Sequence, residues 1–150
     1  MQTIAIACDH GGYDLKEIIK KHYADHYEFL DLGTHSPDSV DYPEYATALA
    51  QEIKKGSVQR GIIICGTGIG ISIAANRQPE VRAANCTDVT MARLTRQHND
   101  ANVLALGARL LGVEVVCDII DTFMNTAFEG GRHIRRIEKM SSCAVDETRK

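Results

Sequence analysis

Gly61-Ile62-Ile63-Ile64-Cys65-Gly66-Thr67-Gly68-Ile69-Gly70 is the stretch of sequence that decides the fold. An apolar run followed by a glycine-rich turn is typical of a buried strand that leads into a helix, and residues 71–76 have a helix-like composition. Three glycines let backbone N–H groups crowd around a ligand, and a helix N-terminus adds positive potential there. Cys65 ends the predicted strand, where the same field favours a thiolate. The stretch therefore predicts an anion-binding loop with an ionisable thiol beside it.

Apolar runs and helical patterns alternate along the rest of the chain. The predicted strands cover residues 3–8, 27–32, 62–65, 81–86 and 102–107. The predicted helices cover residues 15–23, 44–55, 71–76, 88–96 and 113–128, and a polar helix begins at about His133. Strands that are apolar throughout and alternate with helices indicate a parallel sheet covered on both faces. We therefore expect a single three-layer α/β domain over residues 1–150.

Composition excludes several classes of protein. The 150 residues are 44% hydrophobic and 25% charged, as in ordinary globular proteins, and the net charge of −3 indicates no nucleic-acid partner. No apolar run approaches the roughly 18 residues of a membrane span, and the N-terminus lacks a signal pattern, so we expect a cytoplasmic protein with no membrane partner. The five cysteines are widely spaced without a C-x-x-C pair, which predicts neither a disulfide framework nor a thiolate zinc site.

Polar residues that could carry chemistry cluster near the ends of the predicted strands. In doubly wound sheets, ligands gather at the carboxyl ends of strands, so many of these residues could converge on one edge. Asn99 and Asp100 could fix the tautomer and orientation of His98. The arginines after Gly131 are suited to oxyanion binding, although such a run is more often the solvated face of a helix. The candidates are Asp9, His10, Cys65, Thr67, His98, Arg109, Arg132, His133, Arg135 and Arg136.

Other motifs are absent. A dinucleotide fingerprint needs glycine at position 71, where the chain has Ile71, and the Lys-Ser/Thr pair of a Walker loop is missing. A nucleophile elbow needs glycine two residues before Cys65, where Ile63 stands. No H-E-x-x-H pattern occurs, so no metal is expected.

Four segments together closely resemble the ribose-5-phosphate isomerase B family: residues 8–12, 65–76, 96–102 and 129–133. The resemblance runs in order over about residues 1–140. It implies a Rossmann-like sheet of five parallel strands in a homodimer or homotetramer, and neither a metal nor an organic cofactor. It also implies active sites shared between subunits, with the helix from about residue 132 contacting the partner.

The resemblance also implies roles for individual residues. Family members interconvert aldose and ketose phosphates through a cis-enediolate, and Cys65 matches the base that moves the proton between C1 and C2. His98 matches the group that opens the sugar ring, supplied by the partner subunit. Thr67 and the amides of Gly66, Gly68, Ile69 and Gly70 match the anion hole. The positions for sugar hydroxyls and phosphate match Asp9, Tyr42, Asn99, His10, Arg109, Arg132 and Arg136, with His133 a weaker match.

Three functions remain open at this point. The leading one is interconversion of ribose 5-phosphate and ribulose 5-phosphate in the pentose phosphate pathway. The second is isomerisation of a hexose 6-phosphate, allose or galactose 6-phosphate, and the third is a non-catalytic sugar-phosphate sensor. The presence of both Cys65 and His98 in one chain favours the pentose enzyme.

Overall fold

The computed structural model describes residues 1–143 and contains a single five-stranded sheet in that range. All strands are parallel and lie in the order β2-β1-β3-β5-β4. The strands are β1 Gln2–Cys8, β2 Tyr27–Asp31, β3 Gly61–Cys65, β4 Ala83–Asn85 and β5 Val103–Gly107. The helices are α1 Tyr13–His22, α2 Tyr42–Lys55, α3 Ile69–Ala75, α4 Val89–Asn99, α5 Val113–Asn125 and α6 Arg132–Cys143, and a 3-10 turn, η1, covers His10–Gly12. The predicted α/β fold with a five-stranded parallel sheet is confirmed.

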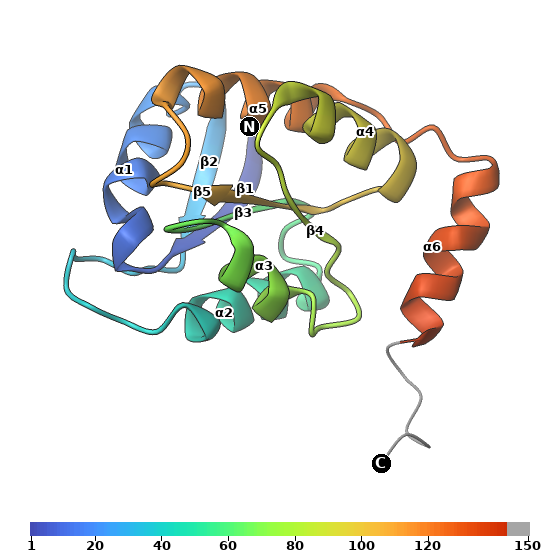
Figure 1. Cartoon of the computed structure of the whole chain (residues 1–150), viewed down its shortest axis with the longest axis horizontal. Coiled ribbons are helices and arrows are strands. Elements are labelled where there is room, and N and C mark those ends of the chain that lie inside the picture. The colour runs from blue at the N-terminus through green and yellow to red at the C-terminus, as the bar shows by residue number, and fades with distance from the viewer. Residues whose placement is uncertain (144–150) are drawn as a thin grey trace, which may run out of the picture.

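Helices cover both faces of the sheet. Helices α1, α4 and α5 lie on one face, and α2 and α3 lie on the other (Figure 1). Successive strand residues point to opposite faces, so Ile4 and Ile6 pack under α1 and α5 while Ala5 and Ala7 pack against α2. The small alanines let α2 approach the sheet closely. Burial on both faces explains why the strands read as continuous apolar runs.

The strand order creates a crevice at the carboxyl edge. After β1 the chain forms β2 on one side of it, and then returns to form β3 on the other side. The loops that leave β1 and β3 therefore turn to opposite faces and open a gap between them, which is where ligands bind in open α/β sheets. Strand β5 lies next to β3, so the loop after β5 borders the same gap.

Several elements end at residues other than those predicted. Helix α4 continues past Arg96 to Asn99, because Asp100 adopts a left-handed conformation and its N–H caps the helix at the Thr95 carbonyl. Helix α2 begins at Tyr42 rather than Glu44, since a proline is well tolerated in the first helical turn. Helix α5 ends at Asn125, and the extended Thr126 that follows it is bound through its carbonyl by an arginine of α4. Edge strand β4 is three residues long and pairs with β5.

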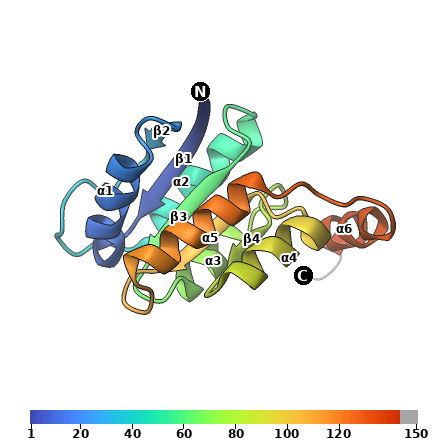
Figure 2. The same ribbon diagram turned by 90° about the horizontal axis from the view of Figure 1, so that it is seen from above.

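Helix α6 stands apart from the sheet, beyond the end of α4, in both views (Figures 1 and 2). Two of its apolar side chains, Ile134 and Met140, are about half exposed at 47% and 51%. Residues 144–150 lie outside the described residues. None of the helices within residues 1–143 combines the length and apolar character needed to cross a bilayer.

Candidate active site

A pocket of about 250 Å³ opens at the carboxyl edge of the sheet, in the crevice between the β1 and β3 loops. All but one of its lining residues were predicted from the sequence as site residues, and Gly11 is the addition. The lining consists of Asp9, His10, Gly11, Tyr42, Cys65, Gly66, Thr67, Gly70 and Arg109. The fold thus brings together residues from four separate segments of the chain.

Cys65 is distinguished from the other buried cysteines by its surroundings. Cys65 is the last residue of β3, lines the pocket and is 5% exposed. The Gly68 N–H donates to its Sγ at 3.2 Å. Desolvation raises the pKa of Cys8 to about 11 and that of Cys86 to about 12, so those thiols stay protonated at neutral pH. Of these three cysteines, Cys65 alone lines the pocket.

The glycine loop after β3 is tightly packed. Gly68 has a φ of 78°, and a Cβ there would lie 2.4 Å from Asn85 Oδ1, so only glycine fits. The N–H of Ile69 donates to Thr67 Oγ1 at 3.2 Å, and the N–H of Gly68 already points at Cys65. Two of the predicted anion donors, Gly68 and Ile69, are therefore paired inside the loop. Helix α3 has only seven residues, so local amides rather than a long helix dipole must supply positive potential.

The loop after β1 and the start of α2 form the opposite wall. Asp9 is buried and its Oδ1 accepts the Gly11 N–H at 2.9 Å. The Nδ1 of His10 lies 3.2 Å from both the amide nitrogen and the carbonyl oxygen of Val40. A Cβ on Gly70 would lie 2.8 Å from Tyr42 Cζ, so the tyrosine ring rests directly on the glycine loop.

Arg109 closes the pocket from the β5 side. Its backbone N–H donates to the Gly66 carbonyl at 3.0 Å, and a Cβ on Gly66 would lie 3.3 Å from Arg109 Cδ. The arginine side chain therefore lies across the glycine loop. Arg109 is exposed, so its guanidinium is accessible to an anionic ligand.

A buried ion pair supports the loop that carries Val40. Lys16 is fully buried, and its Nζ lies 2.7 Å from Asp31 Oδ1 and donates to the Thr34 carbonyl at 2.6 Å. Desolvation alone would raise the pKa of Asp31, but hydrogen bonds from Lys16, Lys20 and the Gly33 N–H outweigh it and hold that pKa below its usual value. The pair ties α1 to the chain that leads into α2.

Most of the other predicted residues lie elsewhere, in a group that we call the α4–α6 cluster: His98, Asn99, Arg132, His133 and Arg136, together with Glu129, which was not predicted. The candidate Arg135 is exposed on α6. His98 and Asn99 end α4, and the other members lie at or near the start of α6. The His98 and His133 rings are stacked, with centroids 4.6 Å apart and planes 18° from parallel. His133 is 5% exposed, and burial together with the nearby Arg132 and His98 lowers its pKa. A neutral His133 therefore packs against His98 near neutral pH.

The α4–α6 cluster and the Cys65 pocket lie at opposite edges of the sheet. Both neighbours of α4 in the chain, β4 and β5, are parallel, so α4 must run antiparallel to them. Its last turn therefore reaches the amino edge, whereas Cys65 is at the carboxyl edge. Many of the polar candidates therefore meet at the carboxyl edge, as expected, whereas the members of the α4–α6 cluster do not join them within a single chain.

One group within residues 1–143 has ligand atoms close enough to suggest a metal. His98, Glu129 and His133 offer nitrogen and oxygen atoms within 4.8 Å of one another. The nearly parallel imidazoles, however, direct their in-plane lone pairs side by side rather than toward one point. Arg132 and Arg136 also add positive charge, since both contribute to lowering the pKa of His133. The arrangement fits a divalent cation poorly, and the absence of a metal stays a prediction.

Sequence reasoning overlooked Arg82 and did not predict the ion pairs of Asp100. Asp100 was expected to help to orient His98, and its carboxylate lies 2.8 Å from Arg96 Nη1 and 3.6 Å from Arg82 Nη2. The four-residue spacing of Arg96 and Asp100 is typical of ion pairs on helices, but the predicted helix ended at Arg96, so this pair was not predicted. Arg82 comes from a distant segment, and nothing local in the sequence indicates its contact.

A second cavity, of about 420 Å³, lies between α6 and the body of the protein. Asn99 and two residues of α6, Met140 and Ser141, border it. The rest of its wall comes from the segment around β4, from α4 and from the turn before β5: Asn76, Gln78, Pro79, Val81, Arg82, Ala83, Ala84, Thr95 and Ala101.

Comparisons with known proteins agree with this geometry. A family model described as Ribose/Galactose Isomerase matches residues 4–140. The chain is 45% identical over 150 residues to ribose-5-phosphate isomerase B of Escherichia coli K12, covering 99% of both chains. It is similar to the Clostridium thermocellum ribose-5-phosphate isomerase B structure, with a TM-score of 0.91, 50% identity and coverage of 95% and 97%. A Mycoplasma genitalium ribose-5-phosphate isomerase B structure with bound ribulose-5-phosphate also matches, with a TM-score of 0.91, 41% identity and coverage of 96% and 97%.

Proposed function

The chain belongs to the ribose/galactose isomerase family, and from this premise we propose that it interconverts ribose 5-phosphate and ribulose 5-phosphate. The observation that carries the proposal is the Cys65 pocket, in which a cysteine, a hydroxyl donor, a carboxylate and an arginine face one small cavity. The names of the relatives and the ribulose-5-phosphate held by one of them support this choice of substrate.

We assign the proton transfer to Cys65. As thiolate it takes a proton from C2 of the open-chain aldose and returns it to C1, passing through a cis-enediolate, while the proton on O2 is transferred to O1. Such an intermediate is unstable in water, and hydrogen-bond donors aimed at the developing oxyanion lower the barrier. We assign this role to the Thr67 hydroxyl and to the amides of Gly66 and Gly70, because all three residues line the pocket. Asp9 and Tyr42 bind sugar hydroxyls, and His10 and Arg109 bind the phosphate.

The site is completed by a second copy of the chain. His98, Asn99, Arg132 and Arg136 lie at the sheet edge opposite Cys65, so in this proposal they act in the partner's pocket, where His98 opens the sugar ring and the arginines bind phosphate. Exposed isoleucines support the contact: Ile69 and Ile73 are 52% and 54% exposed on α3, next to the glycine loop. An apolar surface beside a catalytic loop is typical of a face covered by a partner.

The experiment that tests the proposal measures conversion of ribose 5-phosphate to ribulose 5-phosphate in the presence of a chelator. We expect robust turnover by the wild type and a loss of at least about a thousandfold for Cys65→Ala, because the base is removed. Cys86→Ala is the matched control and should keep wild-type turnover, since that cysteine is also buried but lies outside the pocket. Near wild-type turnover by Cys65→Ala would refute the base assignment.

An inactive wild type would redirect the substrate assignment. Allose 6-phosphate and galactose 6-phosphate are then the next substrates to assay under the same conditions. Turnover of either would keep the chemistry and change the substrate, whereas binding of sugar phosphates without turnover would support a sensor.

A further inference from the structure

Asp100 is the one non-glycine residue within 1–143 that has a positive φ, at 46°. Its N–H caps α4 at the Thr95 carbonyl, so this conformation ends the helix two residues after His98. Most residues disfavour a left-handed backbone, while aspartate and asparagine tolerate it better. A sharp bend is thus held immediately beside His98 and Asn99.

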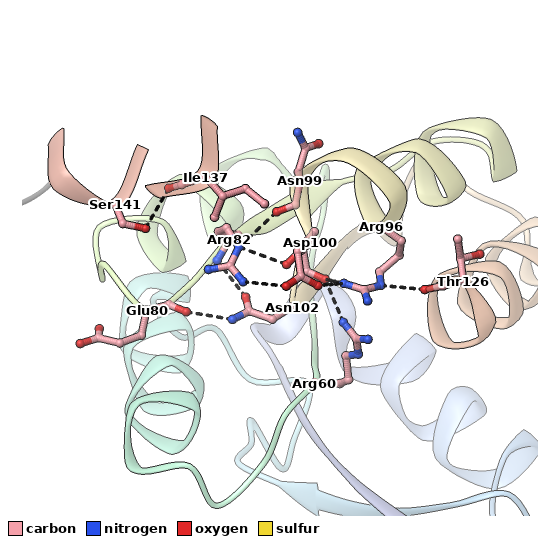
Figure 3. Close-up of polar contacts among 11 residues, drawn as sticks. Arg60, Glu80, Arg82, Arg96, Asn99, Asp100, Asn102, Thr126, Ile137 and Ser141 are labelled. Atoms are coloured by element: carbon pink, nitrogen blue, oxygen red, sulfur yellow. Dashed lines mark hydrogen bonds and ion pairs between the residues drawn. The ribbon is translucent and has the colours of Figure 1, made fainter. Parts of the chain in front are cut away.

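Two arginines clamp the Asp100 carboxylate, as Figure 3 shows. Arg96 Nη1 lies 2.8 Å from Oδ1, and Arg82 Nη2 lies 3.6 Å from Oδ2. The Arg96 side chain is only 3% exposed, so hydrogen bonds and an ion pair inside the protein must offset the cost of burying its charge. We call Asp100, Arg82 and Arg96 the Asp100 clamp.

The same arginines also bind the backbone that follows His98. Arg82 Nε donates to the carbonyls of Asn99 and Asp100 at 3.2 and 3.1 Å. Arg96 Nη1 donates to the Ala101 carbonyl at 2.7 Å, and Arg60 donates to that carbonyl at 3.2 Å (Figure 3). Each of the three carbonyls after His98 is therefore held by at least one guanidinium.

The clamp reaches the other side of His98 as well. Arg96 Nε donates to the Thr126 carbonyl at 3.2 Å, where the chain leaves α5. Three residues further on, the Glu129 N–H donates to the Gln97 carbonyl at 3.1 Å. From Glu129 the chain leads to His133, whose ring stacks on His98. Arg96 thus fixes both the helix that carries His98 and the segment that presents its stacking partner.

We propose that Asp100, held by Arg82 and Arg96, is a positioning residue that sets His98 for opening the sugar ring, an inference that rests on the function proposed above. Ring opening breaks the bond between C1 and the ring oxygen, while a proton leaves the C1 hydroxyl and a proton joins the ring oxygen. An imidazole can mediate both transfers only when it is oriented toward these oxygens. The clamp supplies that orientation without touching the sugar.

Two rates separate ring opening from the later proton transfer. Isomerisation of ribose 5-phosphate requires both steps, because this sugar is mostly a closed ring in water. Ribulose 5-phosphate cannot close a five-membered ring, since its O5 carries the phosphate. Exchange of its C1 proton with deuterium oxide, followed by NMR, therefore reports the Cys65 step alone.

We expect Asp100→Asn to lower kcat for ribose 5-phosphate about tenfold while deuterium exchange at saturating ribulose 5-phosphate stays within about twofold. Asparagine tolerates the left-handed backbone, so the variant removes the charge and keeps the bend. Asp100→Gly, which also keeps the bend, should behave in the same way. Arg82→Gln, at a side chain 23% exposed, should show a smaller change of the same kind, and it provides the test if the Asp100 variants fail to fold.

Glu52→Gln is the matched control. It removes an ion pair with Lys55 at the C-terminal end of α2, where Gly56 supplies a similar left-handed cap. Both rates should match the wild type. The proposal is overturned if the two rates fall in parallel in the Asp100 variants, or if neither changes. A wild type that lacks both rates overturns the proposed function itself, and this is seen before any substitution is made.

Discussion

The Cys65 pocket and the α4–α6 cluster are built in different ways. The pocket is made of short turns that follow β1, β3 and β5, and glycines set its shape where a Cβ would collide with Asn85 or Tyr42. The α4–α6 cluster is instead held by long side chains, chiefly the Asp100 clamp, which connect segments distant in sequence.

The proposed reaction needs groups held in place in both regions, and each region holds them in its own way. Backbone packing around Cys65 leaves little freedom, as suits a base and an oxyanion site. Charged side chains beside His98 hold a helix end that, in the proposed function, acts in the partner's site. The following predictions test this contrast, from the largest expected effect to the smallest.

Mixing two inactive variants should restore activity if the two regions serve one shared site. Cys65→Ala and His98→Gln should each be nearly inactive, because each removes one catalytic group from every site. Unfolded together and refolded as an equal mixture, they should recover about a quarter of wild-type activity, since half of the dimers are mixed and each has one intact site. The measurement is specific activity after co-refolding, and recovery no greater than the sum of the parents would contradict a shared site.

Gly68→Ala should damage the pocket through the backbone. The left-handed φ and the 2.4 Å approach to Asn85 Oδ1 predict a loss of about 2–3 kcal/mol in unfolding free energy together with reduced turnover. Gly112→Ala is the control, because its φ is −75° and nothing lies within 4 Å of the added Cβ. Urea denaturation compares the stability of the two variants. Equal midpoints would contradict the prediction that the packing around position 68 requires glycine.

Arg136→Ala should weaken substrate binding more than chemistry. Loss of one guanidinium from a phosphate site predicts a rise in KM of about tenfold with a smaller change in kcat. Arg135→Ala is a close control, since this neighbour is also exposed on α6 but has no assigned role. Steady-state kinetics on ribose 5-phosphate distinguish them, and an unchanged KM for Arg136→Ala would remove it from the phosphate site.

The Lys16–Asp31 pair should make stability depend on acid pH. The pKa of Asp31 is lower in the folded protein than its value of about 3.9 in the unfolded chain. The ionised carboxylate therefore stabilises the fold above that unfolded pKa, and this stabilisation is lost as the pH falls through the folded pKa. We expect the wild type to lose stability more steeply below pH 4 than Asp31→Asn, which has no carboxylate to protonate at this position. Melting temperatures across pH 2.5–7 measure it, and identical slopes would exclude the linkage.

The sequence predicted the local parts of this molecule better than the distant ones. The run before Cys65 and the glycines after it identified β3, its turn and the pocket, because burial and backbone conformation act over a few residues there. The end of α4 was predicted three residues early, because no glycine marks it and Asp100 adopts a glycine-like conformation. The contacts of Arg82 with Asn99 and Asp100 cross 17 and 18 residues, and no pattern of hydropathy records such contacts.

The opposite-edge arrangement also bears on how the protein behaves on dilution. If each site needs Cys65 from one chain and His98 from another, a lone chain carries two half-sites and no whole one. Activity per milligram then follows the law of mass action, falling once the protein concentration drops below the dissociation constant of the dimer. Substrate that contacts both chains would bind the dimer preferentially. The sugar phosphate would therefore lower the apparent dissociation constant of the dimer.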